Sequence, residues 1–319
     1  MELPNSEVRQ GLVRAYAEVQ ASLERDSNAR PLVLPNGQFF PDVFTGDEAS
    51  VQRLLDRLLE HAALSDMAIT ARIWGEAAAS CGTGACGSCG PAPQAEAESV
   101  ERLVDAGDAW QINVLPAEVG KPVALASALS RAIALAVLRE ADHPPANLEL
   151  DLAVDLCAVA LGYGVLLLEG SHIYSKSCGG PSVARTTALG PTELSLVLAL
   201  SAAVNKQSRS QVDKHLSPTQ KEAFAEALAW ADSNPALVQA LQSDPERIRR
   251  GEFELKEATS WLGRWFSSKL RRPATAETAV TIEDLERALQ SSSVARAPAK
   301  PRDPKLEEIR RLVDEALSE

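Results

Sequence analysis

Two long apolar segments near the middle of the chain constrain the fold more than any other feature of the sequence. Residues 123–140 are apolar on nearly every side of the helix that their pattern predicts, and residues 148–168 form a second apolar segment after a break that contains two prolines. A helix that is apolar all round has to be buried by other elements. Aromatic residues make up only 4% of the chain, so alanine, leucine and valine must fill the core around these helices.

The flanking segments predict an α+β fold that is predominantly helical. Apolar residues recur at helical spacing in several segments, and two shorter segments alternate as strands do. The expected helices span residues 6–25, 45–61, 193–204, 218–231, 235–242 and 254–270. The expected strands, 67–74 and 110–115, flank a loop rich in glycine, cysteine, proline and alanine, and we expect them to form a small β-hairpin or sheet.

Composition divides the chain into a core and a C-terminal tail. We expect an N-terminal helix, a core that carries a cysteine-rich hairpin loop at 75–98, a helical extension, a flexible linker rich in alanine, proline, serine and threonine, and a C-terminal amphipathic helix. These five parts span residues 1–30, 31–245, 246–271, 272–304 and 305–319. An amphipathic helix at the end of a linker is suited to docking on a protein partner.

The charge balance argues against nucleic-acid and anionic-membrane partners. The chain has 32 lysines and arginines against 44 aspartates and glutamates, a net charge of −12, whereas phosphate binding depends on basic side chains. One basic concentration is predicted to be a solvated face, and it consists of Arg247, Arg249, Arg250, Lys269, Arg271 and Arg272.

The N-terminus and the cysteines predict a cytoplasmic protein. The first residues lack the basic and then apolar pattern of a secretory signal, and no stretch reaches about 18 apolar residues without a charge. The chain has five cysteines, an odd number, and three of them fall within nine residues. This is not the spacing of a disulfide framework, so we expect reduced thiols.

The two apolar segments also carry polar residues in a notable order. Residues 125–131 read LASALSR, and the second segment supplies the carboxylate pair of residues 151–155, DLAVD, twenty residues after Arg131. This order resembles the zinc metalloproteases of the gluzincin type. In that family an HExxH helix supplies two zinc-binding histidines and a glutamate base, and an ExxxD helix supplies a third ligand and a carboxylate that orients a histidine.

A second resemblance extends over roughly residues 30–240. The chain is similar to a group of uncharacterised bacterial proteins in which an FFPD-like segment, here residues 39–42, precedes an AHELAH-type helix and a TDL-type helix. The resemblance rests on the pattern and order of the elements. It implies a zincin-like core of buried helices with a helical C-terminal extension.

The residues at the family's catalytic positions imply that peptidase activity is lost. Ser127 stands at the first histidine, Ala128 at the glutamate and Arg131 at the second histidine. Serine and arginine are poor zinc ligands, and alanine cannot act as a general base. Asp151 and Asp155 keep their carboxylates, and Arg131 could replace the charge of a metal by pairing with either. The alternative is that these are ordinary helices with polar ends.

A cysteine-rich loop gives the sharpest local signal. Residues 81–91, CGTGACGSCGP, place Cys81, Cys86 and Cys89 in a C-x4-C-x2-C pattern. The loop resembles the cluster loop of plant-type [2Fe–2S] ferredoxins and of molybdenum hydroxylases, in which thiolates are the ligands and glycines let the backbone approach the cluster closely. The next cysteines in the chain are Cys157 and Cys178.

Three other interpretations of the cysteine loop stay open. The three thiolates, with His61, His172, Cys178 or a water, could hold zinc; two thiols could form a redox-active dithiol; or the loop could bind nothing. Separately, Cys178 and His172 lie six residues apart and could form a nucleophilic pair.

The sequence therefore predicts a non-catalytic binding or regulatory protein on a degenerate metalloprotease-like scaffold, which acts through protein partners. The alternative is a metal- or redox-binding protein that uses Cys81, Cys86 and Cys89, with zinc favoured over an iron–sulfur cluster. An enzyme that uses Cys178 and His172 is a third hypothesis.

The metal hypothesis for the cysteine loop predicts about one zinc, or iron with acid-labile sulfide, per chain. Elemental analysis and a visible absorption spectrum of protein purified anaerobically without a histidine tag measure this. Cys86→Ser should lower the bound metal, because it removes one thiolate of the three. A folded, colourless wild-type protein without metal would contradict the hypothesis.

Overall fold

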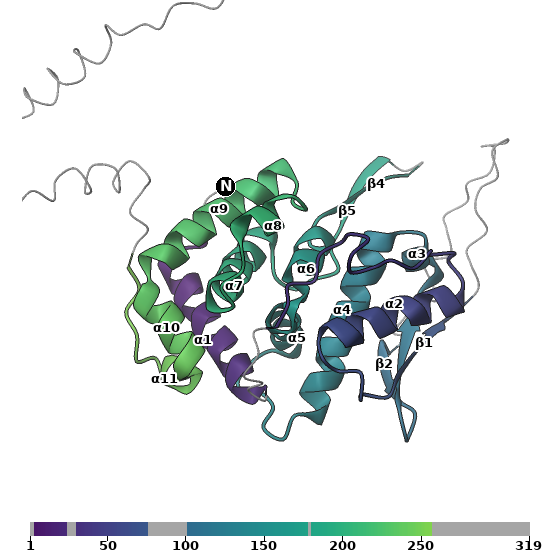
Figure 1. Ribbon diagram of the computed structural model, residues 1–319, viewed down its shortest axis with the longest axis horizontal. Coiled ribbons are helices and arrows are strands. Elements are labelled where there is room, and N and C mark those ends of the chain that lie inside the picture. Colours follow the sequence, from purple (N-terminus) through teal and green to yellow (C-terminus); the bar gives the residue numbers. More distant parts are fainter. Residues whose placement is uncertain (1–2, 24–29, 76–100, 178–179, 257–319) are drawn as a thin grey trace, which may run out of the picture. The chain divides into compact units, whose positions relative to one another are not determined.

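The computed structural model describes residues 3–23, 30–75, 101–177 and 180–256 (Figure 1). These residues belong to the first of two units into which the chain divides, Met1–Ser260. The fold is α+β: helices make up most of it, beside one three-stranded sheet and one two-stranded hairpin. The cysteine loop, Cys178 and the tail beyond residue 256 lie outside the described residues.

The first apolar segment forms helix α4 (Pro122–Glu140), as predicted. Pro122 occupies the first helical position, where its missing N–H leaves no hydrogen bond unmade. Fully buried side chains follow one another along the helix, among them Leu125, Leu129 and Ile133. Its buried alanines let neighbouring elements approach closely, and α4 contacts α2, α5, α6 and the strands of the sheet.

The second apolar segment forms two helices joined by a kink. Helix α5 (Leu150–Ala158) leads through η1 (Val159–Tyr163), in which Gly162 leaves the helical conformation, into α6 (Gly164–Gly170). Gly162 adopts a φ of 99°, and its carbonyl accepts a 2.9 Å hydrogen bond from the Val33 amide. A Cβ at Gly162 would lie 2.3 Å from the Pro31 carbonyl oxygen, so the glycine makes room for an extended segment that crosses the helix here.

The remaining helices enclose these two. They are α1 (Ser6–Ser22), α2 (Glu48–His61), α3 (Pro116–Val119), α7 (Pro191–Val204), α8 (Arg209–Asp213), α9 (Pro218–Ser233), α10 (Pro235–Ser243) and α11 (Pro245–Arg249). Helix α7 is buried on almost every side, and α9 packs along it. Helix α1 contacts α5, α7 and α11, so the N-terminal helix belongs to the same packed unit as the core.

The two predicted strands pair in one small sheet, as one of the two expected arrangements required. It consists of β1 (Ile69–Ile73), β2 (Leu103–Asp105) and β3 (Trp110–Val114) in the order β1-β3-β2. Strands β1 and β3 are parallel, so the other arrangement, a hairpin of these two strands around the cysteine loop, was wrong. The hairpin is β2–β3, whose antiparallel pairing turns the chain round between Asp105 and Trp110.

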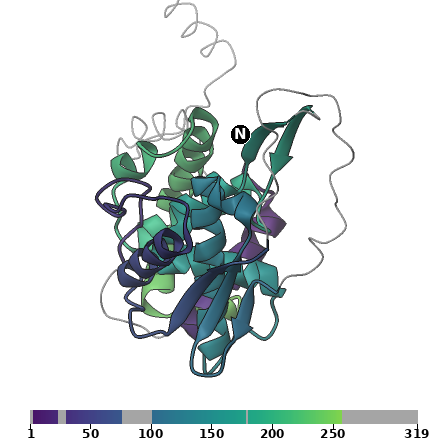
Figure 2. The same ribbon diagram turned by 90° about the vertical axis from the view of Figure 1, so that its right-hand side faces the viewer.

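Helix α2 covers the outer edge of β1, as Figure 2 shows. The Gln52 side chain accepts a 2.7 Å hydrogen bond from the Ala71 amide and donates to the Ile69 carbonyl. The Glu48 carboxylate accepts from the Ile73 amide at 3.1 Å. Side chains of α2 thus satisfy the backbone groups that another strand would otherwise pair with.

The hairpin formed by β4 (Ile173–Ser177) and β5 (Gly180–Ala184) extends away from the helices in both views. Residues 185–190 lead from β5 into α7. By length and composition alone, α4 and the stretch Leu150–Gly170 could each cross a membrane. In this fold 61% and 78% of their most apolar windows are buried, which is the environment of core helices.

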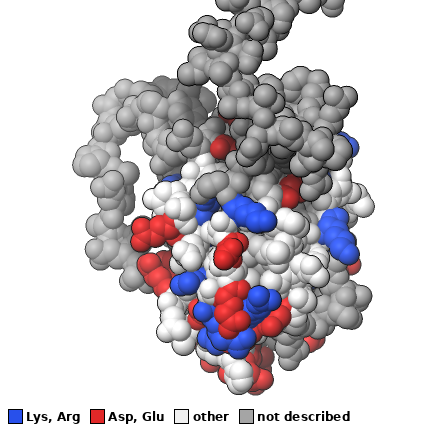
Figure 3. Space-filling model, turned by 90° about the vertical axis from the view of Figure 1, so that its left-hand side faces the viewer, with Lys and Arg blue, Asp and Glu red and all other residues white. Residues whose placement is uncertain are grey.

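The basic residues of α11 are paired with acids. Arg249 forms an ion pair with Glu246, and Arg250 forms one with Glu252 at 3.0 Å. On the side of the unit where α10 and α11 lie, Figure 3 shows blue and red side chains interleaved. The described part of the basic concentration is therefore a mixed, solvated surface, as the sequence indicated; Lys269, Arg271 and Arg272 lie outside the described residues.

Gly162→Ala should lower the free energy of unfolding by several kcal/mol, because the methyl group would meet the Pro31 carbonyl and the residue has positive φ. Gly11→Ala is the matched control: Gly11 is exposed in α1 with nothing near its added methyl, so this change should stabilise by about 0.5–1 kcal/mol. Urea unfolding measures both. Equal effects of the two substitutions would contradict the proposed crossing.

Candidate functional site

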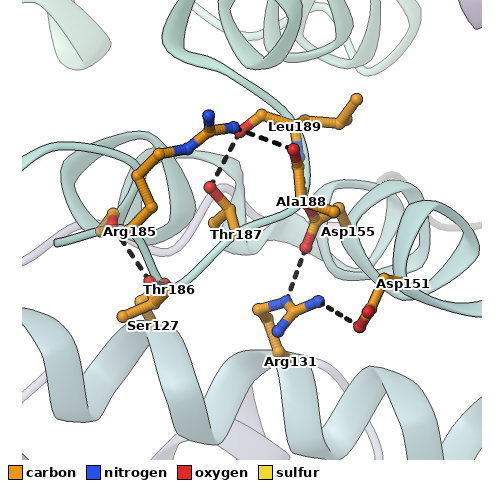
Figure 4. A network of polar contacts seen from close by, with 10 residues as sticks. Ser127, Arg131, Asp151, Asp155, Arg185, Thr186, Thr187, Ala188 and Leu189 are labelled. Atoms are coloured by element: carbon orange, nitrogen blue, oxygen red, sulfur yellow. Dashed lines mark hydrogen bonds and ion pairs between the residues drawn. The ribbon is translucent and has the colours of Figure 1, made fainter.

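A buried ion pair joins α4 to α5 at the positions that the gluzincin resemblance singled out (Figure 4). Arg131 Nε donates to Asp155 Oδ1 at 2.6 Å, and Arg131 Nη2 donates to Asp151 Oδ1 at 2.9 Å. The side chain of Asp155 is fully buried, that of Arg131 is 22% exposed and that of Asp151 is 69% exposed. The pairing that the sequence suggested for Arg131 is therefore present with both aspartates.

Asp155 also holds the loop that leads into α7. Its Oδ2 accepts a 2.8 Å hydrogen bond from the Leu189 amide, while Oδ1 accepts from Arg131. Burial raises the pKa of the Asp155 carboxyl, and the Arg131 guanidinium and the Leu189 amide oppose that rise. One carboxylate thus ties together α4, α5 and residues 185–190.

Ser127 lies one turn before Arg131 and faces the same loop. Its hydroxyl is 2.8 Å from the Thr186 hydroxyl, which donates to the Gly170 carbonyl at 3.0 Å. A Cβ at Gly170 would lie 2.3 Å from Ser127 Oγ, so the end of α6 is packed directly against α4 here. Ala128, the next residue, is buried and offers no polar atom in its side chain.

The loop has its own polar contacts. The Arg185 guanidinium donates to the Ala188 carbonyl, and the Thr187 hydroxyl donates to the Leu189 carbonyl, both at 2.9 Å. The next amide, Gly190, donates to the Glu193 carboxylate at 2.7 Å. Two consecutive amides at the start of α7 therefore point at carboxylates, and the loop conformation is fixed from both sides.

This cluster cannot carry out zinc hydrolysis. A guanidinium stays protonated and has no lone pair for a metal, so Arg131 is not a ligand. Ala128 cannot accept a proton from water, and the Ser127 hydroxyl is occupied by Thr186. What the arrangement does is neutralise two carboxylates and join three segments of the fold.

Several of the other predicted ligands lie outside the described residues, namely Cys81, Cys86, Cys89 and Cys178. His61 is engaged elsewhere, because its Nε2 lies 2.9 Å from the Phe39 carbonyl and its ring packs edge-on against the Phe39 ring. His172 is exposed. Within the described ranges, no group of three or more histidine, cysteine, aspartate or glutamate side chains could hold a metal.

Cys157 is the cysteine that the structure does place. It is fully buried in α5, and burial raises the pKa of its thiol to about 12. A thiol with such a pKa stays protonated near neutral pH and is a poor nucleophile and a poor ligand. Cys157 is therefore a small apolar residue of the core.

No pattern in the sequence indicated a groove beside the ion-pair cluster. A cavity of about 330 Å³ lies between the segment 35–44, α2, the start of α4 and α6. Its walls are mostly apolar and include Phe40, Val43, Phe44, Leu54, Val123 and Leu166. At one rim Arg57 forms a 2.8 Å ion pair with Asp42 and holds the pKa of that carboxyl below its usual range.

A second hollow, of about 490 Å³, shares two lining residues with the cavity, Val123 and Glu169. Its other walls come from His172, from Pro191 at the start of α7, and from the start of α9. The two hollows are therefore adjacent, and we call them together the Glu169 groove, defined by the residues that line either of them. Glu169 lies where the hollows meet.

The Glu169 carboxylate is in an unfavourable position. It stands in the last turn of α6, where the helix dipole opposes a negative charge, and it is half-buried among apolar side chains. Burial raises its pKa. Among the residues whose side chains the structure describes, it has no hydrogen-bond or ion-pair partner. The sequence feature that could have pointed to this site is a single acid, Glu169, directly after the apolar residues 165–168.

Comparison of the chain with known proteins found no matching family, no matching curated protein and no matching solved structure.

Asp155→Asn should lower the free energy of unfolding by about 3 kcal/mol or more, because it leaves the Arg131 guanidinium without its buried carboxylate. In addition, the new side-chain NH2 group would face either Arg131 or the Leu189 amide, both of which are donors. Asp151→Asn makes the same chemical change at the exposed end of the pair and should cost less than about 1 kcal/mol. Urea unfolding of both variants is the measurement. A similar cost for both would contradict the assignment of Asp155 as the central residue.

Glu169→Gln should stabilise the protein near pH 7 and leave it unchanged near pH 4. The pKa of Glu169 is higher in the folded than in the unfolded protein, so the folded state binds the proton more tightly and loses stability as pH rises through this interval. The gain should be below about 1 kcal/mol, because the carboxylate keeps some contact with water. Glu226→Gln, at an exposed position of α9, is the control for the substitution itself. A pH-independent gain would contradict the charge argument.

Proposed function

We propose that this protein is a non-catalytic binding or regulatory protein built on a degenerate metalloprotease-like scaffold. The observation that supports it is the guanidinium of Arg131, which bonds both aspartates of the DLAVD sequence. Arg131 stands where the gluzincin pattern has its second histidine, and the two aspartates stand where it has a ligand and an orienting carboxylate.

The ion pair accounts for how such a scaffold keeps its fold without a catalytic metal. Two carboxylates that face the same helix repel each other unless a cation lies between them. The planar fork of Arg131 supplies a fixed positive charge and two directed donors. Unlike a metal, this cation is part of the chain, so it cannot exchange and it offers no open coordination position to a substrate.

The same residues argue for binding rather than catalysis. The cluster lies next to a groove, because Ala126 lines the cavity while Ser127 belongs to the cluster. Apolar concave surfaces with a few polar groups are the usual form of ligand sites. We place the protein in the cytoplasm with protein partners, for which the amphipathic segment 305–319 is the candidate docking element.

The alternative function, metal or redox binding by Cys81, Cys86 and Cys89, rests on the C-x4-C-x2-C spacing alone. It is independent of the Arg131 cluster. The two hypotheses are therefore separable by the elemental analysis given above.

Arg131→His tests whether the guanidinium stands in place of a metal. The shorter imidazole leaves space beside Asp151 and Asp155 and completes a set of one nitrogen and two carboxylate ligands, so zinc should raise the melting temperature of this variant. Arg131→Gln, whose side chain has no nitrogen with a lone pair for zinc, is the matched control, and zinc should raise its melting temperature much less. If both folded variants respond alike to zinc, the scaffold proposal is wrong.

Two measurements on the purified full chain test the function itself. Peptide hydrolysis should stay at background with and without added zinc. Partners captured from a lysate should be lost from a chain that ends at residue 304 while its melting temperature is unchanged. Chelator-sensitive hydrolysis that copurifies with the protein, or an identical set of partners for both chains, would overturn the proposal.

A further inference from the structure

The Glu169 groove contains a carboxylate that no described side chain neutralises. Arg57 lines the same cavity, but it is bonded to Asp42 and to Glu60, each at 2.8 Å. Arg131, one turn along α4 from the cavity wall, is bonded to Asp151 and Asp155. Among the residues whose side chains the structure describes, none forms an ion pair with Glu169.

The surroundings of this carboxylate are those of a ligand site rather than of a solvated surface. Phe40, Leu54, Val123 and Leu166 line the same cavity, and Val123 is exposed to 43% although it is apolar. The cavity volume of about 330 Å³ falls within the range of small-molecule sites. A lysine side chain of a partner would leave much of this volume unfilled.

We propose that the Glu169 groove binds a small organic cation, a primary amine with an apolar aliphatic or aryl body. The ammonium group pairs with the Glu169 carboxylate, and the apolar body lies against Phe40, Leu54 and Val123. This inference rests on the binding role proposed above and names the chemical class of its ligand.

Both parts of such a ligand are required by the groove. An apolar molecule without a charge would cover Glu169 and leave a carboxylate buried without a partner, which is unfavourable. A small cation without an apolar body would leave the aromatic and aliphatic wall exposed to water. An anion would be repelled by Glu169. The groove therefore selects amines over alcohols and carboxylates that have the same carbon chain.

The test uses the purified full chain and three probes with the same carbon chain: hexylamine, hexanol and hexanoate. Phenethylamine is added as an aryl amine. Ligand-observed NMR and isothermal calorimetry near pH 7 measure binding. The amines should bind at least about tenfold more tightly than hexanol, because a hydrogen bond to a charged group is stronger than one to a neutral group, and hexanoate should bind most weakly.

Two substitutions place the site. Glu169→Gln should reduce the affinity for hexylamine to that for hexanol, whereas Glu7→Gln, an exposed carboxylate of α1, should leave both unchanged. Val123→Arg sets a guanidinium beside Glu169 and should abolish amine binding, whereas Val8→Arg, at a similarly exposed valine of α1, should not. The melting temperature of each variant confirms that it is folded.

Three results would overturn the inference. These are undiminished hexylamine binding by Glu169→Gln, equal affinity of the wild type for hexylamine and hexanol, and no binding of any amine at millimolar concentration. None of them bears on the zinc response of Arg131→His, so failure of the amine site and failure of the scaffold proposal are distinguishable.

Discussion

The fold depends on one carboxylate, that of Asp155, which is fully buried and bonded on both oxygens. A charge at such depth is unfavourable unless each lone pair meets a donor, and here the donors come from two other segments. Arg131 on α4 supplies one, and the Leu189 amide before α7 supplies the other. Burial of Asp155 therefore requires α4, α5 and the loop to be in place together. Apolar packing alone, with so many interchangeable alanines and leucines, would specify their relative register less sharply.

The elements that the sequence predicted well are those whose own composition decides their environment. All-round apolarity placed α4 and the α5–α6 region in the core, because a helix that is apolar on every side has to be covered by other elements. The pairing of Arg131 with the aspartates was suggested by the resemblance to gluzincins, in which the corresponding positions of the two helices meet.

The features that the sequence did not predict depend on contacts between distant segments. Alternation in residues 67–74 and 110–115 indicates strands but not their direction, and the short β2, which makes the real hairpin with β3, has too few residues to show a pattern. The Glu169 groove likewise takes its walls from the segment 35–44, α2, α4 and α6. No local pattern brings those residues together, so only the assembled fold shows that an isolated acid lies among them.

The kink at Gly162 has a consequence for the orientation of everything that follows it. With a φ of 99° and a ψ of 2°, Gly162 lies outside the helical region, so α5 and α6 are two helices and not one. The periodicity that places Asp151 and Asp155 one turn apart on α5 therefore does not continue into α6. Glycine adopts this backbone conformation readily, and a Cβ at this position would meet the Pro31 carbonyl. A single glycine thus separates the orientation of the acid at the end of α6 from that of the aspartates on α5.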